Sequence, residues 1–284
     1  MQTTRGVIIT GASSGIGLEC ARRLSSRGFH VFAGFRKEPD AARLERLAPG
    51  HITPVKLDVT DAASIKSAVK AIEKCPNGVV PYGLVNNAGI VIAGPLELLP
   101  IDAFRMQIDV NLIGQLAVSQ AFIPLLRSHH GRIILMGSIL GRFALPALGA
   151  YSCSKFALEA MAEALSMELA GTGVSVSLIA PGNIESPVWE KSLKTALDIA
   201  GDLSGRDWDP YRDAIEPAMG YLTRLPERGI SAEKVALAVE RALTKRTPKK
   251  RYAVGLDSVF LGRLLPAFPA GMRQAILRRV VLRR

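Results

Sequence analysis

A tyrosine and a lysine four residues apart, Tyr151 and Lys155, are the side chains of this chain best suited to acid–base chemistry. On a helix, residues i and i+4 lie on the same face, so the phenol and the ammonium would stand side by side. A nearby positive charge favours the phenolate, and we therefore expect Lys155 to lower the pKa of Tyr151 below its usual value of about 10. A phenol tuned in this way can donate or accept a proton. Solvated surface pairs share this spacing, so the pair needs support from the rest of the chain.

The first residues of the chain predict a nucleotide-binding turn. An apolar run at residues 7–9 is followed by TGASSGIG at residues 10–17, and then by a helical pattern through Leu18, Ala21 and Leu24. In a strand, turn and helix of this kind, the glycines let a phosphate approach the backbone, and the helix start offers unpaired N–H groups. The GxxxGxG spacing therefore indicates a dinucleotide site, with an ordinary tight turn as the alternative.

The end of the second predicted strand, residues 31–35, bears on the choice of dinucleotide. About 20 residues past the glycines, a carboxylate would bind the ribose 2′-hydroxyl of NAD. Arg36 and Lys37 stand there instead, and the first carboxylate is Glu38. A guanidinium can hold a 2′-phosphate through paired hydrogen bonds. The sequence thus favours NADP(H) over NAD(H), while Arg36 as an ordinary exposed loop cation is the alternative.

Together these motifs resemble the short-chain dehydrogenase/reductase family, in its compact single-domain branch, from about residue 4 to about residue 187. Residues 151–161 and 187–192 are similar to the 17β-hydroxysteroid and retinol dehydrogenase members of that family. The motifs occur in the family's order: TGASSGIG, Leu57-Asp58-Val59, Asn86-Asn87-Ala88-Gly89, Asn111, Ser138, Tyr151 with Lys155, and Pro181-Gly182.

The resemblance implies a role for each matching residue. Ser138 would polarise the substrate oxygen, Tyr151 would transfer the proton, and Lys155 would tune Tyr151 and hold the nicotinamide ribose. Asn111 would hold a water that links Lys155 to solvent. Taken alone, Ser138 reads as a turn cap and Asn111 as a helix amide bonded to backbone. The cofactor would contact Gly11, Ser13, Ser14, Gly15, Ile16, Gly17, Arg36, Asp58, Val59, Asn87, Ala88, Gly89, Tyr151, Lys155, Pro181, Gly182, Ile184 and Ser186.

The chain departs from the family pattern at two of its motifs. Ser186 stands where the family often has threonine, and the hydroxyl is kept. Gly137, next to Ser138, stands where the family often has serine. Neither change removes a proposed catalytic group.

Apolar runs alternate with helical patterns from residue 5 to about 185. This alternation predicts an α/β fold, a Rossmann-type doubly wound parallel sheet in three α/β/α layers forming a single domain, with a C-terminal helical extension. We expect a catalytic domain at residues 1–255, containing a substrate-covering segment at 187–231, and a tail at 256–284. The resemblance also implies a homodimer or homotetramer formed through helices near residues 104–127 and 151–170.

The net charge of +11 is concentrated at the end of the chain. Residues 241–284 hold twelve Lys and Arg but one acidic residue, Asp257, whereas bases and acids balance in the rest. This basic, amphipathic tail could lie on an anionic lipid surface as a peripheral membrane contact, or could pack its apolar face on the protein. No nucleic-acid-binding motif accompanies the charge, so nucleic acid is not expected as a partner.

The three cysteines and four histidines show no metal-ligand spacing, so we expect no metal and reduced thiols. Cys153 is expected to pack on another face of the Tyr151 helix. Neither an N-terminal signal nor a run of 18 or more apolar residues is visible. We therefore expect a cytoplasmic protein, at most peripheral at a membrane.

The leading functional hypothesis is an NADP(H)-dependent oxidoreductase that interconverts an alcohol and a carbonyl. Hydride transfer belongs to the nicotinamide, and the chain must align the substrate and manage one proton. Apolar residues at 140–148, beside the proton donor, favour a lipophilic steroid-, retinoid- or long-chain-like substrate. One alternative is a dinucleotide-binding regulatory or scaffolding protein with little turnover. Another is a sugar-nucleotide epimerase or dehydratase, for which the chain after Pro187 looks short.

Overall fold

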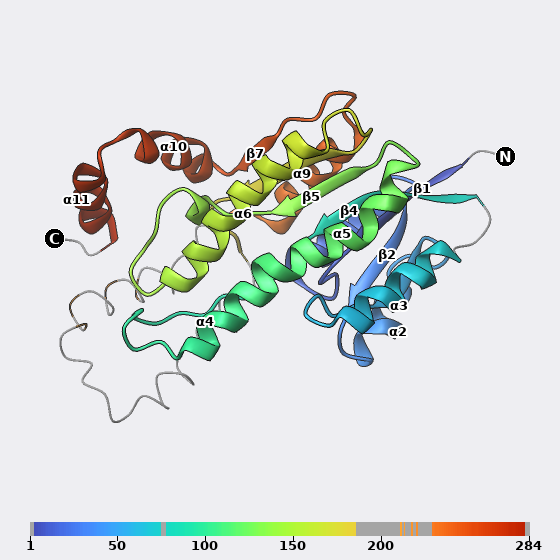
Figure 1. The fold of residues 1–284 in the computed structure, drawn as a ribbon, viewed down its shortest axis with the longest axis horizontal. Coiled ribbons are helices and arrows are strands. Elements are labelled where there is room, and N and C mark those ends of the chain that lie inside the picture. Colours follow the sequence, from blue (N-terminus) through green and yellow to red (C-terminus); the bar gives the residue numbers. More distant parts are fainter. Residues whose placement is uncertain are drawn as a thin grey trace.

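The structure, a computed structural model, describes residues 3–74, 78–185, 211, 213, 217, 220 and 229–281. Its centre is a sheet of seven parallel strands in the order β3-β2-β1-β4-β5-β6-β7 (Figure 1). The predicted doubly wound α/β sheet is confirmed, and β7 adds a strand that the sequence analysis did not identify. The strands are β1 (Thr4–Ile9), β2 (His30–Phe35), β3 (Ile52–Lys56), β4 (Val79–Asn86), β5 (Arg132–Met136), β6 (Ser175–Pro181) and β7 (Arg251–Val254).

Helices cover both faces of the sheet, because successive strand residues point to opposite sides. In β1, Val7 and Ile9 enter one core cluster while Ile8 enters the other. α1, α2 and α9 pack into the first cluster, and α3, α5 and α6 pack into the second, which gives the predicted three layers. The helices are α1 (Gly15–Ser26), α2 (Pro39–Glu45), α3 (Ala62–Glu73), α4 (Ile101–Ile108), α5 (Gly114–Arg127), α6 (Gly149–Glu168), α9 (Ala232–Thr244), α10 (Leu256–Leu264) and α11 (Ala270–Val281).

The strand order changes direction between β1 and β4. In a parallel sheet, the loops at the carboxyl ends of strands on either side of such a point diverge and leave a cleft between them. The segments after β1, β4, β5, β6 and β7 all start at this one edge, because the strands are parallel. The residues predicted for catalysis and for cofactor binding lie mainly in these segments.

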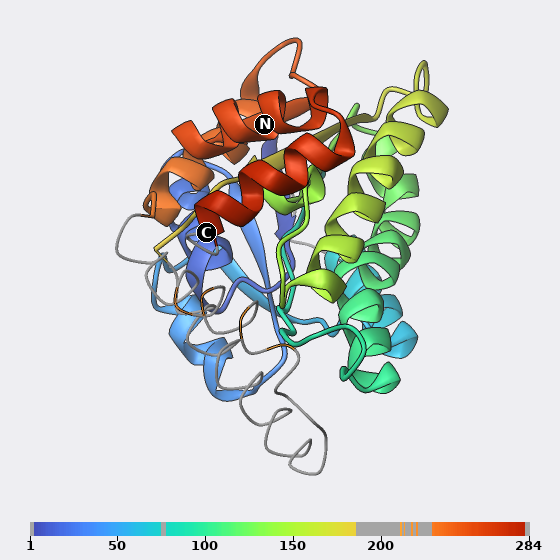
Figure 2. The ribbon, with the colours of Figure 1, turned by 90° about the vertical axis from the view of Figure 1, so that its left-hand side faces the viewer.

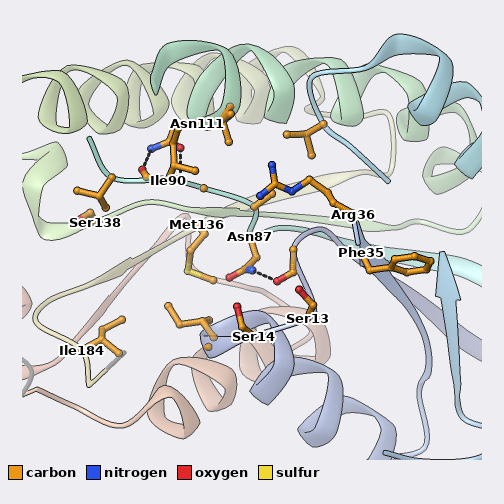
Figure 3. Close-up of a pocket in the computed structure, with 18 of the residues that line it drawn as sticks. Ser13, Ser14, Phe35, Arg36, Asn87, Ile90, Asn111, Met136, Ser138 and Ile184 are labelled. Atoms are coloured by element: carbon orange, nitrogen blue, oxygen red, sulfur yellow. Dashed lines mark hydrogen bonds between the residues drawn. The ribbon is translucent and has the colours of Figure 1, made fainter. Parts of the chain in front are cut away.

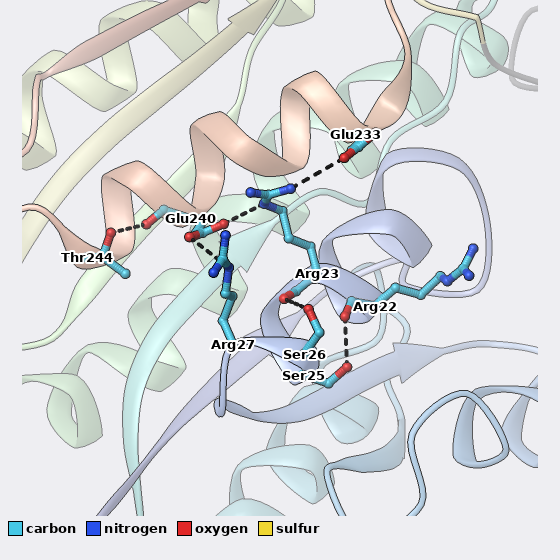
Figure 4. Close-up of polar contacts among 8 residues, drawn as sticks. All are labelled: Arg22, Arg23, Ser25, Ser26, Arg27, Glu233, Glu240 and Thr244. Carbon is cyan, nitrogen blue, oxygen red and sulfur yellow. Dashed lines mark hydrogen bonds and ion pairs between the residues drawn. The ribbon is translucent and has the colours of Figure 1, made fainter.

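Ion pairs hold α1, the helix that follows the glycine-rich turn, against α9 (Figure 4). Arg23 Nε donates to one carboxylate oxygen of Glu240 at 2.5 Å, and Arg27 Nε lies 3.4 Å from the other. Arg23 also lies 3.6 Å from a carboxylate oxygen of Glu233. The side chains of Arg23 and Glu240 are each only 16% exposed, so solvent and salt screen this pair less than a surface pair. The network therefore fixes the helix of the nucleotide turn to a helix formed more than 200 residues later.

A helical extension follows β7, as predicted, and consists of α10, the 3₁₀ turn η5 (Leu265–Ala267) and α11 (Figure 2). One side of it packs on the body of the protein. Leu265 is 3% exposed, and Leu261, Ile276 and Leu277 pack against the cluster that contains Leu148. The packing alternative for the tail thus holds for this inner side. The outer side carries exposed apolar residues.

A continuous helical run covers Ile101–Arg127 and joins α4 to α5 through a π-helical segment, η1 (Asp109–Ile113). By length and composition alone this run could cross a membrane. In the structure, its residues Val118, Phe122 and Leu126 are fully buried in the core cluster against the sheet. The run therefore serves as a covering helix of the α/β fold.

Candidate active site

A cleft of about 600 Å³ opens at the carboxyl edge of the sheet, beside the point where the strand order changes (Figure 3). It brings together most of the residues predicted for the site. Gly17 does not line the cleft but packs against two lining residues, Gly11 and Asn87. Ser186 lies outside the described residues. The predicted residues that line the cleft are Gly11, Ser13, Ser14, Gly15, Ile16, Arg36, Asp58, Val59, Asn87, Ala88, Gly89, Asn111, Ser138, Tyr151, Lys155, Pro181, Gly182 and Ile184.

Other residues of the cleft were not assigned to the site from the sequence. Most of them directly precede or follow a predicted residue, so a wider reading of each motif would have found them. Asp40 and Arg43 are different, because they come from α2, which carries no motif. The unassigned lining residues are Phe35, Lys37, Asp40, Arg43, Leu57, Ile90, Val91, Val110, Met136 and Gly137.

The turn between β1 and α1 lets a ligand approach the backbone closely. Gly11 and Gly15 have φ values of +63° and +53°, a region that glycine adopts without steric cost. At Gly17 an added Cβ would lie 2.5 Å from Asn87 Nδ2 and even nearer to the Gly11 carbonyl oxygen. Within the described part of the chain, the side chain of the N-cap residue Ser14 caps no N–H group of α1. These N–H groups and the open turn fit the pyrophosphate of a dinucleotide.

Thr10 and Asn87 fasten the ends of β1 and β4 to each other. The Thr10 hydroxyl accepts hydrogen bonds from the N–H groups of Asn87 and Ala88, both at 2.9 Å. Asn87 Nδ2 in turn donates to the carbonyl oxygens of Thr10 and Gly11, at 3.0 and 3.1 Å. In Figure 3, Asn87 lies between the turn that bears Ser13 and the end of β5 at Met136. The two strand ends are thereby held in register at the floor of the cleft, a task that the sequence analysis did not assign to Thr10.

Cations gather at the end of the cleft formed by β2 and α2. Arg36, Lys37 and Arg43 all line it, together with the carboxylate of Asp40. Arg43 donates to the carbonyl oxygen of Ser13 in the glycine-rich turn, and its guanidinium lies 3.1 Å from Asp40. The Arg36 side chain points into the cleft (Figure 3). An anionic group beyond the second strand would therefore meet positive charge, which suits a 2′-phosphate.

Asp58, after β3, lies on the same side of the cleft. Although burial opposes it, hydrogen bonds from Thr60 and the charge of Arg36 lower the pKa of Asp58 below its usual value. The Thr60 N–H and hydroxyl donate to Asp58 Oδ1 at 2.9 and 2.7 Å. The carboxylate is thus kept ionised and held in a defined place, as a group that contacts an adenine would need to be.

Ser138, Tyr151 and Lys155 meet at the opposite end. Ser138 follows β5 and accepts a hydrogen bond from Leu140 N at 3.1 Å, which caps the short 3₁₀ turn η2 (Ile139–Gly141). Tyr151 is in the first turn of α6, and its hydroxyl shares a hydrogen bond with Ser138. Lys155 lies one turn later, with Nζ 5.6 Å from the centre of the Tyr151 ring. The expected shared helix face is confirmed, and Ser138 combines the capping role with a place beside the phenol.

The pKa of Tyr151 differs from the expectation. Burial raises it to about 12, and the hydrogen bond with Ser138 offsets only part of that rise. Burial also lowers the pKa of Lys155 to about 8. The Lys155 ammonium donates to the Met136 carbonyl oxygen at 2.7 Å, and its charge does not outweigh the loss of water around the phenol. The prediction that the pKa of Tyr151 lies below its usual value is therefore wrong for this structure, because spacing along a helix says nothing of desolvation.

Asn111 lies in the π-helical segment η1, an irregularity that often marks functional sites. Its side chain is fully buried and engaged with backbone. Nδ2 donates to the Ile90 carbonyl oxygen at 2.9 Å and to the Ser154 hydroxyl at 3.2 Å, while Oδ1 accepts from Ile90 N at 2.8 Å (Figure 3). The Ser154 hydroxyl donates to the Tyr151 carbonyl oxygen at 2.6 Å. Asn111 therefore ties the segment after β4 to the helix that bears Tyr151, and its role with a water stays a prediction.

The structure explains one departure from the family pattern and corrects one expectation. At Gly137, an added Cβ would lie 2.8 Å from Leu178 Cδ2 and 3.2 Å from the Ile179 carbonyl oxygen. The side chain of Leu178 thus occupies the space that a serine would need. Cys153, expected to pack, is exposed, because two residues along a helix turn it away from the buried face of Tyr151 and Lys155.

An apolar wall stands beside Tyr151. Leu140, Phe143, Leu145 and Leu148 are buried in one cluster, and Tyr151 packs against it. The wall also receives the extension, because Leu265 of η5 belongs to the same cluster. The predicted apolar segment at 140–148 is therefore buried next to the phenol. The predicted substrate-covering segment lies almost wholly outside the described residues, and with it Trp189, Trp208, Met219 and Tyr221.

Asp257, the acidic residue of the tail, joins the extension to the cleft. Its Oδ2 accepts from Asn183 N at 2.6 Å, and its Oδ1 accepts from Ser258 N at 2.8 Å. The Ser258 hydroxyl donates to the Ala180 carbonyl oxygen at 2.7 Å. The carboxylate also lies so close to the Cα of Gly182, a lining residue, that no side chain fits there. The start of α10 thus fixes the segment after β6, which the sequence analysis assigned to cofactor contact.

Comparison with known proteins identifies the relatives of this chain. The family model described as short chain dehydrogenase matches residues 5–196. A 3-amino-tetrahydro-pyrrolizinone reductase of Xenorhabdus hominickii is 35% identical over 90% of this chain and 88% of its own length. Human retinol dehydrogenase 5 is 34% identical over 95% and 87%, and bovine 17-beta-hydroxysteroid dehydrogenase type 6 is 35% identical over 96% and 87%.

Solved structures agree with these sequence matches. A short chain dehydrogenase from Burkholderia cenocepacia in complex with NADP superposes with a TM-score of 0.71 at 26% identity, covering 99% of this chain and 98% of that one. A short chain dehydrogenase/reductase from Burkholderia phymatum in complex with NAD has the same fold, with a TM-score of 0.78 at 22% identity, covering 94% of this chain and 98% of that one. A dinucleotide of the kind that such proteins bind fits three features of the cleft: the glycine-rich turn, the cations near β2, and the group formed by Ser138, Tyr151 and Lys155. The chain belongs to the short-chain dehydrogenase family and is an NAD(P)-dependent oxidoreductase.

Proposed function

We propose that the protein is an NADP(H)-dependent oxidoreductase that interconverts an alcohol and a carbonyl, with Tyr151 as the proton-transferring group. The observation that carries this proposal is the placing of Tyr151, Ser138 and Lys155 at one end of a cleft that is also lined by the glycine-rich turn. A bound nicotinamide supplies or accepts the hydride. The protein has to orient the substrate and manage one proton.

In the reducing direction, the geometry supports one role for each side chain. With a pKa of about 12, Tyr151 carries its proton at neutral pH and can donate it to a substrate oxygen. The Ser138 hydroxyl, bonded to the phenol, holds the same oxygen and polarises it. Lys155 places a cation against the ring, where it stabilises the phenolate that proton donation leaves behind. Asn111 keeps the Tyr151 helix in place through Ser154.

Replacement of Tyr151 by phenylalanine tests this role. We expect Tyr151→Phe to lower kcat by about 10²- to 10⁴-fold, the usual contribution of general acid–base catalysis, while the dissociation constant of NADPH stays unchanged. Tyr252→Phe is the matched control, since it removes a hydroxyl that contacts Lys249 N on the surface, outside the cleft residues. Full turnover by Tyr151→Phe would refute the assignment. Tight NADPH binding by the wild type, without turnover of any carbonyl, would favour a regulatory dinucleotide-binding protein.

The preference for NADP(H) is supported by Arg36, Lys37 and Arg43 at the ribose end of the cleft. A charge-assisted hydrogen bond contributes about 1.5–3 kcal/mol, which corresponds to roughly 10- to 100-fold in affinity. We therefore expect Arg36→Ala to reduce kcat/KM for NADPH by about that factor and to change kcat/KM for NADH little. Arg46→Ala, at an exposed residue after α2 that bonds the Ala42 carbonyl oxygen, is the control. Higher kcat/KM for NADH in the wild type would contradict the preference.

A lipophilic substrate is supported by the buried apolar wall next to Tyr151 and by the retinol and hydroxysteroid names of two relatives. A panel of purified carbonyls tests it, with a steroid ketone, a retinoid aldehyde and a long-chain aldehyde as its first group. The second group of the panel contains small charged ketones and a bicyclic pyrrolizinone, which the name of the Xenorhabdus relative suggests. The largest kcat/KM is expected for a member of the first group. A preference for the second group would overturn this part of the proposal.

A homodimer or homotetramer is supported by the exposed side of α5 and α6. A surface groove there is lined by residues of both helices, including Leu116, Ile123 and Met161. Phe156 and Met167, on α6, are also exposed. Mass photometry of the purified chain should show a dimer or tetramer, and Ile123→Glu should shift it to the monomer. A wild-type monomer would remove this proposal.

A further inference from the structure

The outer side of the C-terminal extension presents large apolar side chains to solvent. Leu256, Phe260 and Leu264 recur every fourth residue along α10 and are 77%, 58% and 55% exposed. Residues at this spacing lie on one face of a helix. Phe268 and Met272, at the junction of η5 and α11, are exposed as well. We call these five residues the outer apolar face.

This face is not the side by which the extension packs on the protein. The inner side of the same elements is already covered, since Ser258, Gly262 and Leu265 are buried. A helix that is apolar on one buried side normally turns polar residues to solvent on the other. Large apolar side chains exposed at helical spacing, on the side that does not pack on the protein, are therefore typical of a surface that meets a membrane or another protein.

The charges around the outer apolar face favour an anionic lipid surface as the occupant. Arg263 lies one residue before Leu264, and Arg278 and Arg279 are exposed on α11. The acidic residue of this segment, Asp257, is engaged with the backbone of Asn183 and Ser258. Positive charge next to exposed apolar side chains is the composition of helices that lie in the interface of anionic bilayers.

The exposed apolar residues of α4 to α6 provide a contrast. Ile101, Met106, Phe156 and Met167 are exposed to a similar degree. Both signs of charge accompany them, for example Asp102 paired with Arg105 at 2.8 Å, and Glu168 beside Met167. The negative charges on such a mixed surface would repel an anionic bilayer and offset the attraction of the positive ones. Among the described residues of the extension, 256–281, basic charge is accompanied by no carboxylate other than the engaged Asp257, which distinguishes the extension from this second apolar surface.

The position of the extension is also suited to a lipid surface. α10 begins directly after β7, at the carboxyl edge of the sheet where the cleft opens. Figure 1 shows α10 and α11 at this end of the molecule, away from the start of β1. Through Leu265 the inner side of the extension touches the apolar wall beside Tyr151. A surface bound to the outer apolar face would therefore lie near the substrate side of the cleft.

We propose that the outer apolar face, with Arg263, Arg278 and Arg279, docks on the surface of bilayers that contain anionic phospholipids. The proposal does not depend on the identity of the substrate or on turnover. It assigns the exposed apolar side chains to the interfacial layer and the arginines to lipid phosphates. The protein would then be peripheral, held by one helical layer, and released by salt because part of its binding is electrostatic.

Flotation of the full-length protein with vesicles tests the proposal. One set of vesicles contains phosphatidylcholine alone, and the other contains phosphatidylcholine with phosphatidylglycerol. We expect the wild type to float with the anionic set at low salt and to be released at high salt. The double variant Phe260→Ser and Leu264→Ser should bind at least about tenfold more weakly. Arg278→Ala and Arg279→Ala should each weaken binding by roughly fivefold.

A matched control removes apolar area elsewhere. Ile101→Ser with Met106→Ser changes two exposed side chains of α4 that do not line the α5–α6 groove, and should leave vesicle binding within twofold of the wild type. Thermal unfolding of each variant shows whether it is folded. If the Phe260/Leu264 double variant unfolds early, Leu256→Ser takes its place, because Leu256 is the most exposed residue of the outer apolar face. Negligible wild-type flotation with either vesicle, or equal flotation by both double variants, would overturn the proposal. Equal binding to both vesicle sets would overturn its electrostatic part, and a smaller particle mass for the Phe260/Leu264 variant would assign the face to a second copy.

Discussion

The glycine-rich turn lines the cleft, and the C-terminal extension packs against the segment after β6 and the apolar wall beside Tyr151, but the two regions are held in different ways. In the turn, the backbone of Gly17 lies so close to the Gly11 carbonyl oxygen that no Cβ fits between them. The side chains of Thr10 and Asn87 also link two strand ends through four hydrogen bonds to backbone groups. The extension is attached by side chains, through Leu265 in an apolar cluster and through the carboxylate of Asp257. The turn therefore leaves no room for an added atom, whereas the extension can vary on its outer side as long as its attachment points remain.

The largest difference between the two regions should appear when the same change is made in both. Gly17→Ala puts a Cβ against the Gly11 carbonyl oxygen and Asn87, and we expect a loss of about 3 kcal/mol or more in stability. Because the turn is displaced, the dissociation constant for NADPH should rise by at least about 100-fold. At Gly271 in α11, an added Cβ meets no atom of the described residues within 4 Å, so Gly271→Ala should change stability by less than about 1 kcal/mol. Calorimetry and cofactor titration measure both variants, and similar losses in the two would break the comparison.

The two regions also differ in how their cations are solvated. Lys155 in the cleft is buried, whereas Arg263, Arg278 and Arg279 of the extension are exposed. With the Lys155 pKa lowered to about 8, the unfolded chain binds more protons than the folded one between pH 8 and about 10. This residue should make the free energy of unfolding rise with pH in that window, by up to about 3 kcal/mol. Tyr151 acts with the opposite sign, but only above pH 10.

Lys155→Met tests this statement. We expect the variant to lack the rise between pH 8 and 10 and to be more stable than the wild type at pH 7, because a buried charge has been removed. Arg279→Met is the control, and its unfolding free energy should follow the wild-type pH dependence. Urea titrations at a series of pH values provide the measurement. A parallel pH dependence for Lys155→Met and the wild type would show that the lysine is not desolvated.

The smallest effect on stability and cofactor binding is expected at Asp257, where the extension contacts the segment after β6. Asp257→Ala removes the acceptor of two backbone N–H groups and should cost about 1–3 kcal/mol of stability. Since the segment around Gly182 is then less fixed, KM for the cofactor should rise by roughly tenfold with kcat little changed. Asp257→Asn keeps one acceptor oxygen and should restore part of both losses. Asp102→Ala, at an exposed ion pair, is the control, and an unchanged KM in Asp257→Ala would separate the extension from the cleft.

Local sequence was sufficient for the parts of the site that depend on neighbours in the chain. The order of strand, glycines and helix places residues 10–17, and a spacing of four places Tyr151 beside Lys155, because helix geometry repeats regardless of context. The same applies to Ser138, which follows a recognisable strand. Contacts between distant segments had no comparable signal: Arg43 on α2 reaches Ser13, and Asp257 reaches Asn183 only because the sheet brings β6 and β7 together.

What the sequence by itself determined is thus the α/β architecture, the family and the candidate residues, since each follows from periodicity and motif order. Only the tertiary structure decided the direction of the Tyr151 pKa, because desolvation depends on everything that surrounds the phenol. It also decided the two sides of the tail. The composition predicts a tail that is basic and apolar along its length. Which of its apolar residues are buried and which face the solvent depends on its packing against the apolar wall at Leu148.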